Sequence, residues 1–199
     1  MTVKSLVVAT NNRHKLTELR SLFGPEWRIS GASDVAPGLT WDETGDSFEA
    51  NARIKIAALR PFTAGYILAD DSGLCVDALS GKPGVHSSSF GGVEGDHPRN
   101  VRALLGAMRG VAEPLRTARF YCLLLLSDPT GREFKFEGTC EGRILRETSG
   151  EGGFGYDPVF LPDGFSVSMA AMSEGQKNKI SHRGRAATVL LEAVRSGRL

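Results

Sequence analysis

Polar and cationic residues follow the first apolar run of the chain, and their types suit a phosphate group. Leu6 to Ala9 are typical of a buried strand, and residues 10–15 then read Thr-Asn-Asn-Arg-His-Lys. The free N–H groups and the dipole at the start of a helix attract phosphate, and Lys15 adds a positive charge. The pattern GxxxxGK(S/T) is absent, which excludes a P-loop. The structural alternative is a well-capped helix with a lysine on its surface.

Two adjacent carboxylates follow a second apolar run. Residues 66–69 read Tyr-Ile-Leu-Ala and lead directly into Asp70 and Asp71. Neighbouring carboxylates after a buried strand repel each other unless a cation or hydrogen bonds offset the repulsion. Mg²⁺ prefers oxygen ligands and takes several of them from phosphates and water. Asp42 or Glu43, in an earlier loop, could complete such a metal site; an acidic turn before a hairpin is the alternative.

Two later segments have residue types suited to a flat ligand and to phosphate. Residues 152–158 read Gly-Gly-Phe-Gly-Tyr-Asp-Pro, and glycines beside aromatic residues let the backbone approach a flat ligand on which a ring stacks. Residues 177–185 read Lys-Asn-Lys-Ile-Ser-His-Arg-Gly-Arg and offer donors to phosphate and to a keto-bearing base. The alternatives are a tight turn with two core aromatics and a basic, solvated loop that caps a helix.

Hydrophobic periodicity predicts the elements that position these four segments. A first helix follows Asn12 and ends at Gly24-Pro25, where the sequence breaks helical structure. Further helices are expected over residues 47–59, 99–108 and 186–194, and strands over residues 6–9, 27–30, 66–69, 120–126 and 134–136. Hairpins mixed with helical crossovers predict an α/β fold with a mixed sheet, and we expect one domain over residues 1–199.

Composition excludes several classes of protein. The chain has 199 residues, of which 41% are hydrophobic, and its net charge of +1 lacks the basic excess of a general nucleic-acid binder. No apolar run approaches the ~20 residues of a membrane span, and the first run is too short for a signal peptide. Three cysteines without a CxxC pair indicate reduced thiols. We therefore expect a cytoplasmic protein that binds neither nucleic acid nor membrane.

The four segments, in this order, resemble the inosine triphosphate pyrophosphatase family. The matching motifs are Thr-x-Asn-x-x-Lys, Ala-Asp-Asp-Ser-Gly, Gly-Gly-Phe-Gly-Tyr-Asp-Pro and Ile-Ser-His-Arg-Gly, spread over residues 7–187. The resemblance implies an elongated, two-lobed α/β fold around a long mixed β-sheet with flanking helices, and a nucleotide cleft between the lobes. It also implies a Mg²⁺-dependent homodimer that hydrolyses ITP, dITP and XTP to the monophosphate and pyrophosphate, which keeps them out of DNA and RNA.

The resemblance also implies roles for individual residues. Asp71 is the expected proton acceptor and a Mg²⁺ ligand, and Asp42 is the expected second ligand. The family usually has Glu at the position of Asp42, so the shorter side chain leaves Glu43 as an alternative. The residues expected to bind substrate are Thr10, Asn11, Asn12, Arg13, His14, Lys15, Ser72, Phe154, Gly155, Tyr156, Asp157, Lys177, His182 and Arg183.

The resemblance predicts a hydrolytic reaction in which water attacks the α-phosphorus. Asp71 accepts the proton of the water, while Lys15 and Mg²⁺ offset the charge on the phosphates. A 6-keto purine offers an acceptor where adenine has an amino donor, so donors near His182 would select it. One alternative is a pyrophosphatase for other modified nucleotides, such as methylated pyrimidines. Another is a non-catalytic nucleotide-sensing module, which would not need the paired acids at positions 70 and 71.

Overall fold

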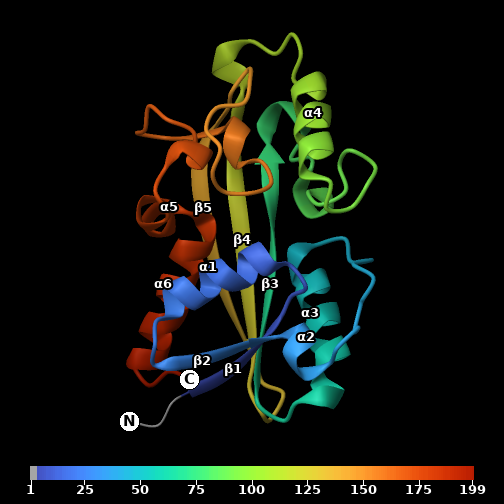
Figure 1. The fold of residues 1–199 in the computed structure, drawn as a ribbon, viewed down its shortest axis with the longest axis vertical. Helices are drawn as coiled ribbons and strands as arrows, with labels where there is room; N and C mark the ends of the chain where they lie inside the picture. The colour runs from blue at the N-terminus through green and yellow to red at the C-terminus, as the bar shows by residue number, and fades with distance from the viewer. Residues whose placement is uncertain (1–3) are drawn as a thin grey trace. The chain divides into compact units, whose positions relative to one another are not determined.

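The computed structural model describes residues 4–199 and contains a mixed six-stranded sheet with flanking helices (Figure 1). The strands are β1 Lys4–Ala9, β2 Trp27–Gly31, β3 Tyr66–Val76, β4 Thr117–Ser127, β5 Glu133–Ile144 and β6 Phe160–Pro162. Their order in the sheet is β2-β1-β3-β4-β5-β6. Strand β1 pairs in parallel with β2 and β3, whereas β5 and β6 are antiparallel. The predicted α/β fold with a mixed sheet is confirmed.

The described residues group into two compact units. Residues 4–71, 122–138 and 183–199 form the first unit, and residues 72–121 and 139–182 form the second. Three strands, β3, β4 and β5, contribute residues to both units. Each unit has a hydrophobic core of its own.

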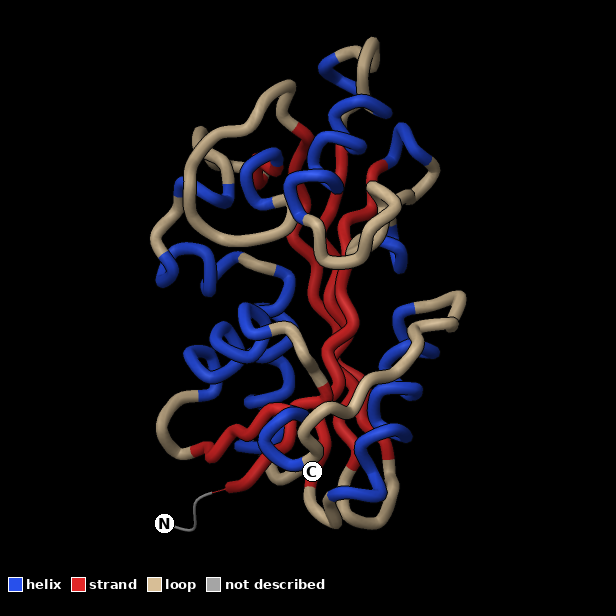
Figure 2. Tube along the Cα trace, turned by 45° about the vertical axis from the view of Figure 1, so that its right-hand side comes forward, coloured by secondary structure: helices blue, strands red, loops and turns tan. Residues whose placement is uncertain are grey.

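In the first unit, helices cover both faces of the strands. These helices are α1 Arg13–Phe23, α2 Ala32–Val35, α3 Phe48–Leu59 and most of α6 His182–Arg195. Figures 1 and 2 show α1 and α6 on one side of the strands and α3 on the other. Leu68 and Cys122 of the strands pack in one cluster with Leu19 of α1 and Leu190 of α6. Because side chains alternate along a strand, residues next to Leu68 in β3 point towards the α3 side.

The second unit contains α4 His97–Ala107 and α5 Glu174–Ile180. Its core includes Phe120 and Phe160, whose rings meet edge to face with centroids 4.7 Å apart. Arg116 is 2% exposed and donates to the backbone carbonyls of Met108, Ile144 and Leu145 at 2.7–2.9 Å. This buried guanidinium therefore joins the end of α4 to the end of β5.

The structure corrects two predictions about secondary structure. Strand β3 does not end at residue 69 but continues through Asp70 and Asp71 to Val76, because both carboxylates have cationic partners that offset their repulsion. The last helix begins at His182 and not at residue 186, so the basic segment at residues 177–185 lies in α5 and the start of α6, with Ser181 between them. Lys177 and Arg183 are buried there, because each pairs with a carboxylate.

The three cysteines all lie within the described residues and are free thiols, as expected. Cys122 and Cys140 are buried in the cores of the first and second units. Over residues 4–199, no helix has both the length and the apolar composition that a membrane crossing requires.

Arg116→Lys should destabilise the protein by about 2 kcal/mol, because an ammonium cannot reach all three carbonyls that the guanidinium bonds. Denaturant unfolding of the variant and the wild type measures this difference. An unchanged unfolding midpoint would show that the three hydrogen bonds contribute little to stability.

Candidate active site

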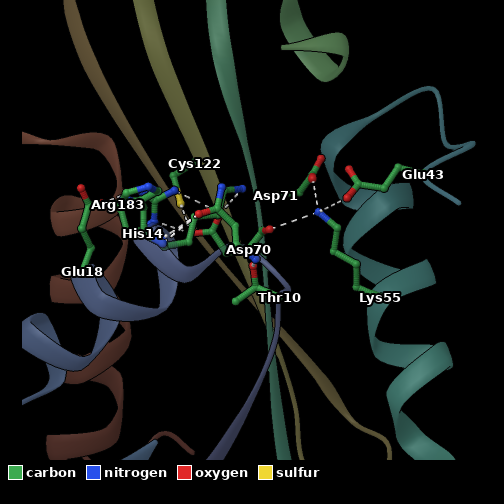
Figure 3. Close-up of polar contacts among 11 residues, drawn as sticks. Thr10, His14, Glu18, Glu43, Lys55, Asp70, Asp71, Cys122 and Arg183 are labelled. Atoms are coloured by element: carbon green, nitrogen blue, oxygen red, sulfur yellow. Dashed lines mark hydrogen bonds and ion pairs between the residues drawn. The ribbon is translucent and has the colours of Figure 1, made fainter. Parts of the chain in front are cut away.

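A buried lysine joins two carboxylates in the first unit. Lys55 lies on α3, and its Nζ is 2.5 Å from Asp71 Oδ1 and 3.0 Å from Glu43 Oε1 (Figure 3). It also donates to the backbone carbonyl of Asp70 at 3.2 Å. Lys55 is 4% exposed, so the ammonium and the Asp71 carboxylate interact away from bulk water.

Burial and the neighbouring charges shift the pKa values of Asp71 and Lys55 in opposite directions. Burial raises the pKa of Asp71 to about 6, although the charges of Lys55 and Lys15 oppose the rise. Burial alone would lower the pKa of Lys55, but Asp71 and Glu43 outweigh it and raise that pKa. A carboxylate with a pKa of about 6 is ionised at neutral pH and still basic enough to accept a proton. Asp71 therefore has the properties of a general base.

The oxygen atoms around Lys55 suit a hard cation. Asp71 and Glu43 provide two carboxylates, and Mg²⁺ often takes only one or two from protein, with phosphate and water as its other ligands. Among residues 4–199, no three side chains of His, Cys, Asp or Glu come together as a complete metal site. A metal here would thus depend on ligands from a bound substrate. Asp42 and Glu43 are both exposed, and Glu43 is the one that contacts Lys55.

Two residues of α3 that the sequence analysis missed position this centre. Lys55 is one of them, and Asn51 is the other, since its Oδ1 accepts from the Gly45 N–H at 2.8 Å. A Cβ at Gly45 would lie 2.6 Å from that oxygen, so only glycine allows this approach. Asn51 thereby fixes the loop that carries Glu43. The signal in the sequence is two polar residues four positions apart on the buried face of a helix, which require partners.

The second carboxylate, Asp70, belongs to a different network. Lys15 Nζ lies 2.8 Å from Asp70 Oδ1, and Arg183 Nε lies 2.6 Å from Asp70 Oδ2. Arg183 also contacts Glu18 (Figure 3). Burial alone would raise the pKa of Asp70, but the charges of Arg183 and Lys15 outweigh it and hold that pKa well below its ordinary value. These cations therefore favour the ionised form of Asp70 and make it a poor base.

At the start of α1, the amides expected to bind phosphate already have partners. Asn12 Oδ1 accepts from the N–H groups of His14 and Lys15 at 2.9 and 3.2 Å, which makes Asn12 the N-cap. The N–H of Asn12 donates to Thr10 Oγ1, and the Asn11 side chain donates to the Leu39 carbonyl. The side chains of Arg13 and His14 are exposed at this turn, and the Lys15 side chain is 15% exposed.

The remaining predicted residues cluster in the second unit. Asp157 Oδ2 accepts from Lys177 Nζ at 2.6 Å and from the Phe154 N–H at 2.8 Å. Lys177 Nζ also lies 4.9 Å from the centroid of the Phe154 ring. At Gly153, with φ of +70°, an added Cβ would lie 2.2 Å from Asp157 Oδ2. The glycine-rich loop thus folds around the Asp157 carboxylate, and the Lys177 ammonium lies over the ring of Phe154.

His182 and Tyr156 are held in the same unit by aromatic and hydrogen-bond contacts. The His182 ring stacks on Phe120 with centroids 4.8 Å apart and an interplanar angle of 11°. Tyr156 donates its hydroxyl to the Ser87 carbonyl at 2.9 Å, and burial raises the pKa of this hydroxyl. Gly155 adopts a φ of +63°, and Ser72 is half-buried in β3. The Tyr156 hydrogen bond thus ties the glycine-rich loop to residue 87, and the stacking on Phe120 fixes the His182 ring.

Lys55→Ala should lower the free energy of unfolding by about 3 kcal/mol, because it leaves two carboxylates without the buried cation that balances them. Arg53→Ala is the matched control on the same helix, since Arg53 pairs with Glu49 and Glu133 at the surface and such pairs contribute at most about 1 kcal/mol. Denaturant unfolding compares the two variants. Equal losses would mean that the buried centre adds no more than a surface ion pair.

Comparisons with known proteins cover nearly the whole chain. The model of the Ham1 family matches residues 6–193. The chain is 41% identical over 193 residues to a dITP/XTP pyrophosphatase of Shouchella clausii, with 96% of this chain and 97% of that protein covered. It is 45% identical over 189 residues to a dITP/XTP pyrophosphatase of Desulforamulus reducens, with 94% of each covered.

Solved structures show the same similarity. The Staphylococcus aureus Ham1 protein matches with a TM-score of 0.85 and 37% identity, over 98% of this chain and 100% of that one. A HAM1 protein from Coxiella burnetii matches with a TM-score of 0.85 and 32% identity, over 97% of this chain and 99% of that one. Both units of the chain are therefore included in the similarity.

Proposed function

The chain belongs to the Ham1 family, and we propose that it hydrolyses ITP, dITP and XTP to the nucleoside monophosphate and pyrophosphate. This reaction removes deaminated purine nucleotides before they enter DNA or RNA. The observation that carries the proposal is the pair of unlike carboxylates at positions 70 and 71. Asp70 lies between the cations of Lys15 and Arg183, whereas Asp71 shares Lys55 with Glu43 and, with a pKa of about 6, is suited to accept a proton. The relatives named dITP/XTP pyrophosphatases support the choice of substrate.

In the proposed mechanism, Asp71 accepts a proton from the water that attacks the α-phosphorus. Lys55, 2.5 Å from Asp71, orients this carboxylate, and Lys15 offsets negative charge on the phosphates. Asp71 and Glu43 would hold a Mg²⁺ ion, which when bound supplies positive charge to the phosphate oxygens. We propose Glu43 as the second metal ligand in preference to Asp42, because Glu43 contacts the same lysine as Asp71.

We assign selection of the base to the cluster in the second unit. The Lys177 ammonium and the His182 imidazole are donors near aromatic rings. A 6-keto purine can accept from such a donor, whereas the amino group of adenine would leave it unpaired. The proposal further includes the homodimer and the cytoplasmic location that the family resemblance implies, and sedimentation equilibrium tests the homodimer.

A nucleotide panel tests the activity. ITP, dITP, XTP, GTP, ATP and a methylated pyrimidine triphosphate are incubated with and without Mg²⁺. Phosphate is then measured with and without added inorganic pyrophosphatase, which separates release of pyrophosphate from release of phosphate. We expect pyrophosphate from ITP, dITP and XTP, with much slower turnover of GTP and ATP. Preference for the pyrimidine would favour the related pyrophosphatase, and binding without turnover would favour a sensing module.

Asp71→Asn should reduce turnover of ITP to below a few per cent of wild type, because the amide keeps the shape of the side chain but cannot accept the proton. Binding of ITP should stay within about tenfold, or ~1.4 kcal/mol. Single-turnover kinetics and equilibrium titration measure the two quantities separately. Substantial turnover by the variant would place the base elsewhere.

Glu43→Gln should raise the Mg²⁺ concentration for half-maximal activity by at least about tenfold, since even groups that only support a metal ligand are worth that much. Asp42→Asn is the matched control in the same loop and should leave this concentration nearly unchanged. Activity on ITP is measured against free Mg²⁺ for both variants. A larger increase in this concentration for Asp42→Asn than for Glu43→Gln would assign the metal to Asp42.

A further inference from the structure

We propose that Glu18 and Arg183 are positioning residues that act through Asp70 to hold the Lys15 ammonium in place for the phosphates of the substrate. This inference rests on the proposed function, in which Lys15 meets the triphosphate. It adds Glu18 to that function and gives Arg183 a positioning role besides the substrate contact that the family resemblance implies.

Four charged groups of the first unit form a continuous chain of ion pairs. Glu18 Oε2 lies 2.5 Å from Arg183 Nη1, Arg183 Nε lies 2.6 Å from Asp70 Oδ2, and Asp70 Oδ1 lies 2.8 Å from Lys15 Nζ. The side chains of Asp70 and Arg183 are 0% and 1% exposed, whereas that of Lys15 is 15% exposed. The buried pair of Asp70 and Arg183 therefore lies between two partly exposed ends, Glu18 at 11% and Lys15 at 15%.

Each of the three nitrogen atoms of the Arg183 guanidinium donates a hydrogen bond to a protein carboxylate. Nε and Nη2 donate to the two oxygens of Asp70 at 2.6 and 3.3 Å, and Nη1 donates to Glu18. Breaking this bidentate pair would leave two buried carboxylates unbalanced, which is strongly unfavourable. The geometry thus assigns Arg183 to Asp70.

The arrangement determines where Lys15 lies. Glu18 fixes the rotation of the Arg183 guanidinium, whose fork then fixes the plane of the Asp70 carboxylate. Oδ1 of that carboxylate accepts from Lys15, and an ammonium has three donors, so two remain for phosphate oxygens. Glu18 and Lys15 are three residues apart on α1 and share a face of that helix. Removing Glu18 should therefore loosen Lys15 without touching its side chain.

The alternative is that the network only stabilises the fold, and an epistasis experiment separates the two. Glu18→Gln and Arg183→Lys are each made in wild type and in Lys15→Ala. KM and kcat for ITP, the Kd of ITP and the melting temperature are measured for every variant. Arg116→Lys is the matched control, because it alters another fully buried arginine whose donors go to backbone carbonyls.

If the proposal is correct, Glu18→Gln and Arg183→Lys raise KM and Kd about fivefold in wild type, the coupling expected for residues in one ion-pair network. In Lys15→Ala they add little further increase. Arg116→Lys lowers the melting temperature but leaves KM nearly unchanged. Glu18→Gln has almost the same shape as the native residue, so it keeps the test available if Arg183→Lys does not fold.

Three results would overturn the proposal. Equal increases with and without Lys15 would show that Glu18 and Arg183 do not act through this lysine. If Lys15→Ala raises KM but Glu18→Gln and Arg183→Lys do not, the proposed function stands and the positioning role is ruled out. Unchanged KM and Kd in Lys15→Ala would remove both the phosphate role of Lys15 and the positioning role. Absence of turnover in the wild type would overturn the proposed function, while the Kd comparison would still test the positioning.

Discussion

Two adjacent carboxylates in the middle of a buried strand are the constraint on which the first unit depends. Consecutive side chains of a strand point to opposite faces, so Asp70 and Asp71 face different helices. Asp70 faces α1 and α6, which supply Lys15 and Arg183, and Asp71 faces α3, which supplies Lys55. Figure 1 shows α1 and α6 on one side of the strands and α3 on the other, and Figure 3 shows Arg183 and Lys55 on opposite sides of the paired carboxylates. Without cations from both helical layers, β3 could not continue through this pair.

The unequal number of cations gives the two carboxylates different chemistry. Asp70 has two strong partners at 2.6 and 2.8 Å, and their charge keeps it ionised despite complete burial. Asp71 has Lys55, which it shares with Glu43, so burial prevails and its pKa rises to about 6. One carboxylate thereby serves as a fixed anion that holds Lys15, and its neighbour is left basic. Glu43 and Asp71 are the two carboxylates proposed to hold a divalent cation, whose other ligands would come from phosphate and water.

The sequence predicted the fold class and the segments that carry the site, but not the partners within them. Local patterns identified the turn at residues 10–15 and the paired acids, because each is short and lies beside an apolar run. The sequence pattern ends this strand too early, at residue 69, because two acids in a row resemble a turn until their cationic partners are known. Arg183 lies 113 residues from Asp70 and 165 from Glu18, and no spacing rule reaches that far. Among the missed residues, Asn51 and Lys55 had a detectable signal, since both are polar and lie on the buried face of α3.

The most direct test of this account is the titration of the two carboxylates in the metal-free protein. Selective ¹³C labelling of aspartate, with Asp71→Asn and Asp70→Asn for assignment, allows the pKa of each carboxyl group to be read from its NMR shift. The account predicts that Asp71 titrates at about 6 and that Asp70 shows no titration down to acid unfolding. Equal pKa values for the two groups, or a higher value for Asp70, would contradict the division of roles between the paired carboxylates.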